Sequence, residues 1–96
     1  SHFKINKYFI DLNSREIILN KIKLKLTEKE TKIITYLSKE KKPVTIEELE
    51  ENVWSYQSDI ETHTVETHIY RLRKKILSTF NDNDFILSEK NGYQIK

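Results

Sequence analysis

Residues 62–76, Thr-His-Thr-Val-Glu-Thr-His-Ile-Tyr-Arg-Leu-Arg-Lys-Lys-Ile, form the stretch that decides how the chain is interpreted. At helical spacing, Val65, Ile69, Leu72 and Ile76 fall on one apolar stripe, which indicates a core-facing side. The other side has hydrogen-bonding and cationic side chains: His63, Thr67, Tyr70, Arg71 and Lys74. A rigid rod with such a face fits the major groove of DNA. The stretch therefore predicts a recognition helix that the rest of the chain supports.

Length and composition favour one domain over residues 1–96. Hydrophobic residues make up 36% and charged residues 33%, yet the apolar residues are periodic, so a small core is expected. The chain has no cysteine, which excludes disulfides and thiolate metal sites. His63 and His68 are five positions apart and miss the i, i+4 spacing that aligns two imidazoles on a metal. We expect no metal and no cofactor.

No apolar run approaches the roughly 20 residues that span a bilayer, and Ser1-His2 is not followed by the apolar segment of a signal peptide. We therefore expect a cytoplasmic protein with no membrane partner.

Charge is segregated along the chain, although the net charge is only +2. Residues 67–75 have four basic residues and no acid, a local +4, and residues 47–51 have four glutamates and no base, a local −4. This pattern suggests two surfaces with different partners. The acidic block is expected to be a solvated helix face. The alternative is a surface for a basic partner such as a polymerase subunit.

Residues 3–26 are expected to form a small antiparallel sheet. Residues 21–26 alternate between lysine and an aliphatic side chain, which indicates a strand with one wet face. Asn20-Lys21 suits a tight turn, because Asn tolerates positive φ, and a phase break at Asn6-Lys7 suggests another turn or a bulge.

Residues 27–80 are expected to contain three helices. Thr27 with Glu30, and Thr45 with Glu48, have the spacing of capping boxes that open the first two helices. Pro43 ends the first segment. The third helix is expected from about residue 61 or 62 to about residue 77.

Residues 84–96 are expected to form a β-hairpin. The only glycine of the chain, Gly92, lies in its turn, where positive φ is needed. Strands, three helices and a hairpin in this order predict an α+β fold, a winged helix-turn-helix in which the hairpin is the wing.

Four blocks of the chain resemble the DNA-binding effector domain of the OmpR/PhoB family of response regulators. The most specific is Thr64-Val65-Glu66-Thr67-His68-Ile69-Tyr70-Arg71-Leu72-Arg73-Lys74-Lys75-Ile76. The other three are Leu26-Thr27 with Lys32-Ile33-Ile34 and Leu37, Thr45 to Leu49 through Val53-Trp54, and Gly92-Tyr93. They occur in the family's order and spacing, and the similarity covers nearly the whole chain after residue 3.

The resemblance implies a winged helix with a four-stranded N-terminal sheet, the third helix in the major groove and the wing near the minor groove. It implies an N-terminal receiver domain, phosphorylated on an aspartate, in the full-length protein of a two-component system. It also implies tandem dimers on direct repeats of promoter DNA, and contact between RNA polymerase and the loop from Ser55 to Ile60.

Three departures from the family pattern involve four positions. The wing turn usually has arginine and glycine, and here has Glu89 and Lys90. Because a carboxylate facing phosphates is unfavourable, we expect Glu89 to point away and Lys90 to make any wing contact. Tyr70 and His63 replace frequent arginines, which affects the target sequence and affinity but not the fold.

The strongest base-reading candidate is Arg71, whose guanidinium can fork to O6 and N7 of guanine. Lys74 is expected to neutralise a phosphate, and Arg73 to reach a phosphate or to pair with an acid. The alternative interpretation of Arg71 is a solvated helix arginine without a role in binding.

Four further candidates have a structural interpretation beside the functional one. Thr64 and Thr67 can touch thymine methyls or phosphate oxygens, with helix capping as the rival role for Thr64. His68 borders the apolar stripe, so a structural histidine is the default and phosphate contact the alternative. Trp54 is expected to belong in part to the core, while its indole N–H can donate to a phosphate.

These features favour a sequence-specific transcriptional regulator. A winged helix used mainly for protein contact is the alternative, supported by the small net charge and the acidic wing residue. An enzyme is disfavoured, since the sequence has no nucleophile–base pair, phosphate-binding glycine loop or metal cluster.

Overall fold

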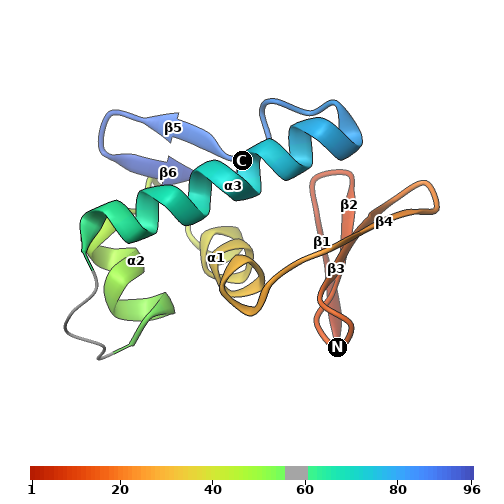
Figure 1. Cartoon of the computed structure of the whole chain (residues 1–96), viewed down its shortest axis with the longest axis horizontal. Coiled ribbons are helices and arrows are strands. Elements are labelled where there is room, and N and C mark those ends of the chain that lie inside the picture. The colour runs from red at the N-terminus through yellow and green to blue at the C-terminus, as the bar shows by residue number, and fades with distance from the viewer. Residues whose placement is uncertain (56–60) are drawn as a thin grey trace.

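The structure, a computed structural model, describes residues 1–55 and 61–96 (Figure 1). The elements in chain order are β1 (His2–Ile5), β2 (Tyr8–Asp11), β3 (Glu16–Leu19), β4 (Ile22–Lys25), α1 (Glu28–Lys39), α2 (Ile46–Val53), α3 (Thr62–Phe80), β5 (Leu87–Glu89) and β6 (Gly92–Gln94). This order confirms the predicted winged helix-turn-helix. No helix within the described ranges is both long and apolar enough to cross a bilayer.

The N-terminal sheet is an antiparallel meander of strand order β1-β2-β3-β4, as predicted. Asn20 and Lys21 both adopt positive φ, 51° and 76°, between β3 and β4, and Asn6 does so between β1 and β2. Ile10 pairs directly with Ile17, and both side chains are fully buried. One face of the sheet therefore packs on the helices.

The two predicted capping boxes differ in outcome. In α1 both bonds are present, because the Thr27 hydroxyl accepts from the Glu30 amide and the Glu30 carboxylate accepts from the Thr27 amide. In α2 only the Thr45 hydroxyl caps, accepting from the Glu48 amide at 3.1 Å.

The Glu48 carboxylate instead accepts a 2.8 Å hydrogen bond from the Tyr36 hydroxyl, which raises the pKa of Tyr36 to about 12. The prediction of a second reciprocal box was wrong, because a tertiary partner replaced the local one. Glu48 is also half-buried, so the acidic block is not a uniformly solvated face.

Helix α3 is three residues longer than predicted, since it ends at Phe80 rather than at about residue 77. Phe80 packs on the Tyr8 ring, with centroids 5.1 Å apart, and this contact favours another helical turn. Asn81 then ends the helix in the left-handed conformation, with φ 56°. Sequence periodicity could not reveal a contact made across the fold.

Tyr8 joins the sheet to the C-terminal end of α3. Its buried ring also meets Phe85 edge-on at 5.0 Å, and its hydroxyl donates a 2.6 Å hydrogen bond to Asp82. Burial, followed by the neighbouring Asp82 carboxylate, raises the pKa of Tyr8. Figure 1 accordingly shows the sheet beside the last turns of α3.

The predicted apolar stripe of α3 is core. Each of Val65, Ile69, Leu72 and Ile76 is at most 1% exposed. Helices α1 and α2 pack against α3, and Figure 1 shows α3 crossing the molecule with these helices on one side and the hairpin on the other. The face of α3 that lies opposite this buried stripe has no helix or strand packed on it in the described part of the chain.

Backbone hydrogen bonds connect the wing to the segment between α1 and α2. Val44 and Tyr93 exchange two hydrogen bonds, of 2.8 and 2.9 Å, as an isolated antiparallel bridge. Gly92 has φ +139°, and a Cβ there would lie 2.0 Å from the Val44 carbonyl oxygen. Glycine is therefore required both by conformation and by close approach.

We predict that Gly92→Ala lowers the free energy of unfolding by at least about 2 kcal/mol, because strained φ is combined with a clash against backbone. Urea unfolding followed by circular dichroism measures this change. Asn91→Ala, in the same turn but without positive φ, is the matched control. Equal stability losses in the two variants would contradict the role assigned to Gly92.

Candidate nucleic-acid interface

The surface of α3 outside the core divides into three longitudinal parts, which follow from the helical repeat of about 3.6 residues. One flank faces the start of α1 through His68 and Lys75, and the other faces the wing through Glu66 and Arg73. Between them lies the outer face, which we define as His63, Thr67, Tyr70, Arg71 and Lys74.

The outer face is accessible, as predicted for a surface that meets a ligand. Tyr70 is 64% exposed, and the Lys74 ammonium lies 5.9 Å from the centroid of its ring, within cation–π distance. His63 and Arg71 are exposed, while Thr67 is half-buried. The structure therefore places hydrogen-bond donors, cationic side chains and an aromatic ring together on the outer face of one helix.

A shallow pocket of about 380 Å³ extends this face toward the end of α3. It is lined by Tyr70, Arg73, Lys74, Leu77 and Asn83. Leu77 is 41% exposed, so the outer face ends in an apolar side chain that the sequence analysis did not single out. Helical spacing could have predicted this position, because Leu77 lies seven residues, or about two turns, after Tyr70 and therefore on the same side of the helix.

Lys75 does not belong to the outer face. Its ammonium donates to the Glu30 carboxylate at 2.7 Å and to the Lys25 carbonyl at 2.9 Å. Glu30 is only 4% exposed and would be destabilising without this partner. The local +4 of residues 67–75 is therefore reduced in space, because one of its four cations neutralises a buried acid of α1.

His68 lies between the core and the α1 flank. Its ring meets Trp54 edge-on, with centroids 5.1 Å apart at 83°. Burial, and then the positive charges of Arg71 and Lys29, lower the pKa of His68, while Glu30 acts in the opposite sense. At neutral pH the imidazole is therefore held neutral and offers an N–H donor rather than a charge.

Trp54, the residue at which α2 ends, is 4% exposed and is thus more fully core than predicted. Lys29 of α1 lies over its ring, with the ammonium 5.9 Å from the ring centroid. Lys29 was not among the candidate residues, and its position far from the basic block gave no signal for it. The predicted polymerase contact over Ser55–Ile60 falls mostly on residues 56–60, which lie outside the described residues.

Thr64 is half-buried in the first turn of α3 and is not its capping residue. The cap position is Glu61, whose carbonyl accepts from the Thr64 amide at 2.9 Å, and no side chain caps this end. The rival capping role for Thr64 was wrong, because the helix begins at Thr62.

Arg73 lies on the wing flank and is half-buried. The charges of Glu66 and Arg73 both act on Tyr93 of β6, although burial is the main cause of the raised pKa of Tyr93. Within residues 1–55 and 61–96, no carboxylate lies at ion-pair distance from Arg73. The expected alternative of an acid partner is thus not found there.

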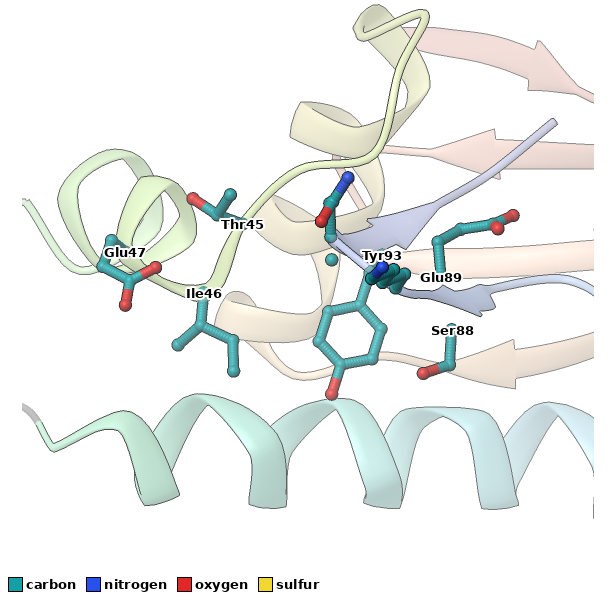
Figure 2. A pocket seen from close by; sticks show the side chains of 9 residues that line it. Thr45, Ile46, Glu47, Ser88, Glu89 and Tyr93 are labelled. Atoms are coloured by element: carbon teal, nitrogen blue, oxygen red, sulfur yellow. The ribbon is translucent and has the colours of Figure 1, made fainter.

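The wing turn and the start of α2 enclose an open pocket of about 330 Å³ (Figure 2). Figure 2 shows Tyr93 and Ile46 directed toward α3, while Glu89 points away from it. The Glu89 carboxylate lies 3.8 Å from the Lys96 ammonium, which compensates its charge. Lys90 at the tip is exposed. No group of three or more potential metal-ligating side chains occurs among the described residues.

We predict that stability falls as pH decreases from about 7.5 to about 5.5. His68 has a folded pKa below its unfolded value near 6.5, so the unfolded chain binds the proton more readily. Urea unfolding at both pH values measures this, and His68→Gln should show a shallower dependence. An unchanged pH dependence in His68→Gln would contradict the assignment.

The family model described as "Transcriptional regulatory protein, C terminal" matches residues 20–95. The chain is 41% identical over 78 residues to the uncharacterized transcriptional regulatory protein YclJ of Bacillus subtilis, covering 79% of this chain and 32% of that protein. It is 29% identical over 93 residues to the response regulator ArlR of Staphylococcus aureus, covering 96% of this chain and 42% of that protein. It thus spans less than half of either relative.

Solved structures show the same fold. The DNA-binding domain of the response regulator AdeR, solved in complex with an intercistronic region, superposes with TM-score 0.81 at 28% identity, covering 98% of both chains. DrrB, an OmpR/PhoB homologue of Thermotoga maritima, gives TM-score 0.79 at 25% identity over 99% of this chain and 44% of that one. The chain belongs to the family of C-terminal effector domains of OmpR/PhoB-type transcriptional regulators.

Proposed function

We propose that this chain binds double-stranded promoter DNA in a sequence-specific manner, with the outer face of α3 in the major groove. The observation that supports this most is the exposed outer face, in which Arg71, Lys74 and Tyr70 stand on a helix whose opposite stripe is fully buried. A helix fixed by its core can present side chains to base edges in one register. The solved AdeR domain in complex with an intercistronic region supports the same assignment.

The residues have distinct proposed roles. Arg71 reads guanine, and Lys74 neutralises a phosphate. Thr64 and Thr67 contact thymine methyls or phosphate oxygens, and His63 and Tyr70 adjust the preferred sequence where relatives often have arginine.

Contacts at the edges of the helix go to the DNA backbone. His68 and Trp54 donate N–H groups to phosphate on the α1 flank. Arg73 and Lys90 act on the wing side, where Glu89 is already paired with Lys96. Phosphate contacts fix the register of the domain on the duplex and lend it no sequence preference of their own.

The wider assembly is also a proposal. Residues 1–96 would act as one DNA-binding domain, and a receiver domain would precede it in a longer cytoplasmic response regulator. Two domains would bind direct repeats in tandem, and the Ser55–Ile60 loop would contact RNA polymerase. No catalytic step is part of this function.

A protein-interaction module with weak DNA binding is the second candidate. The acidic wing residue Glu89, the net charge of +2 and the exposed Leu77 favour it. Salt dependence separates the two functions, because each neutralised phosphate steepens the fall of affinity with salt.

Selection of bound sequences from random duplex DNA tests the proposed function. We expect enrichment of a half-site repeated about one helical turn apart, bound more tightly than scrambled DNA at several salt concentrations. No enrichment, with weak binding that vanishes at physiological salt, would favour the protein-interaction module.

We predict that Arg71→Ala weakens binding to the selected site by about 1–3 kcal/mol and relaxes the preference at one base pair. The reason is that a forked guanidinium contact discriminates guanine from the other bases. Fluorescence anisotropy on single-base variants of the site measures this. An equal loss on selected and scrambled DNA would show that Arg71 does not read a base.

A further inference from the structure

Side chains from three helices converge around the indole of Trp54. Lys29 comes from the first turn of α1, Trp54 from the end of α2, and His68 from α3. The Lys29 ammonium lies 5.9 Å from the centroid of the indole, and the His68 ring meets the indole at 5.1 Å. We call these three residues the α1 corner.

The α1 corner is cationic. Its positive charge is the Lys29 ammonium, which is close enough to His68 to disfavour protonation of the imidazole. Within the described ranges, the Lys29 ammonium has no carboxylate at ion-pair distance. The two acids nearest to Lys29 in sequence are already engaged, Glu28 by Lys32 and Glu30 by Lys75.

Lys29 is also held in place. It is half-buried, and its ammonium lies within cation–π distance of the indole, which restricts the side chain. A cation with restricted freedom loses less conformational entropy when it meets an anion.

We propose that Lys29 is a DNA-contacting residue, and that the α1 corner holds one backbone phosphate at the edge of the major groove. The ammonium of Lys29 supplies charge, and the imidazole of His68 supplies an N–H donor. This inference rests on the proposed function, since it assumes that the outer face of α3 enters DNA.

The position of the corner favours a DNA phosphate over another anion. Phosphates line both edges of a groove that admits a helix, so the two flanks of α3 face them when its outer face meets base edges. Arg73 and the wing occupy one flank, and the α1 corner occupies the other. Cationic side chains would then contact phosphates on both sides of the groove. Lys29 would supply a positive charge that Lys75 cannot, because Lys75 is paired with Glu30.

Salt-dependent binding of Lys29→Met tests this inference. Methionine keeps an unbranched apolar stem on the indole and removes the charge. We expect the slope of log affinity against log salt to become shallower by about one unit, on selected and scrambled duplex alike. Lys29→Arg should retain the slope of the parent chain.

Lys32→Met is the matched control, because it removes one charge from the same helix at a position paired with Glu28 at 3.9 Å. It should leave the slope unchanged. An unchanged slope in Lys29→Met, or the same change in both variants, would overturn the inference. Thermal unfolding of each variant identifies any loss that comes from the fold.

The outcome separates this inference from the function on which it rests. If the parent chain binds no duplex, both fail together. If the parent binds a selected site with steep salt dependence and Lys29→Met does the same, only the α1 corner fails. Replacing chloride with inorganic phosphate at constant ionic strength should not change the effect of Lys29→Met, and abolition of that effect would point to a free-phosphate site.

Discussion

The buried carboxylate of Glu30 is the group on which the geometry of the domain depends. One of its oxygens accepts from the Thr27 amide at 2.8 Å and from the Lys75 ammonium at 2.7 Å, and Lys75 also donates to the carbonyl of Lys25. The end of the sheet, the start of α1 and the middle of α3 thus meet at one charge. Removing one partner of such a pair leaves an uncompensated buried charge, which is strongly destabilising. The orientation of the outer face follows from this junction.

Charge in this domain is arranged differently in space than along the chain. The basic run of α3 contains four cations, yet Lys75 is directed inward to Glu30, whereas Lys29 joins the surface from a distant segment. The acidic wing residue Glu89 is likewise compensated by Lys96. Each of these pairs removes one acid and one base from the free surface charge, so the net charge of +2 says little about where the unpaired cations lie.

Local chemistry allowed most of the fold to be predicted. The apolar stripe of α3, the Thr27 cap and the turn at Asn20-Lys21 follow from residues near one another in sequence. Predictions were wrong where a distant side chain replaced the local partner, as for Glu48, or where a contact lengthened a helix, as at Phe80.

The candidate site shows the same division. The residues of the outer face follow from helical spacing, since all of them belong to one element. Lys29 joins the proposed DNA-facing surface, and Lys75 leaves it, because of how α1 packs against α3. The periodicity of a sequence does not reveal such packing between helices.

The bridge between Val44 and Tyr93 consists of backbone hydrogen bonds, and Gly92 beside it has no side chain. The distance between the wing and the helices is thus set by groups that nearly every amino acid shares. Side chains at the wing tip and on the outer face can change while that distance stays constant. Such a domain is suited to diverge in sequence preference by single substitutions, because new target specificity does not require a new backbone.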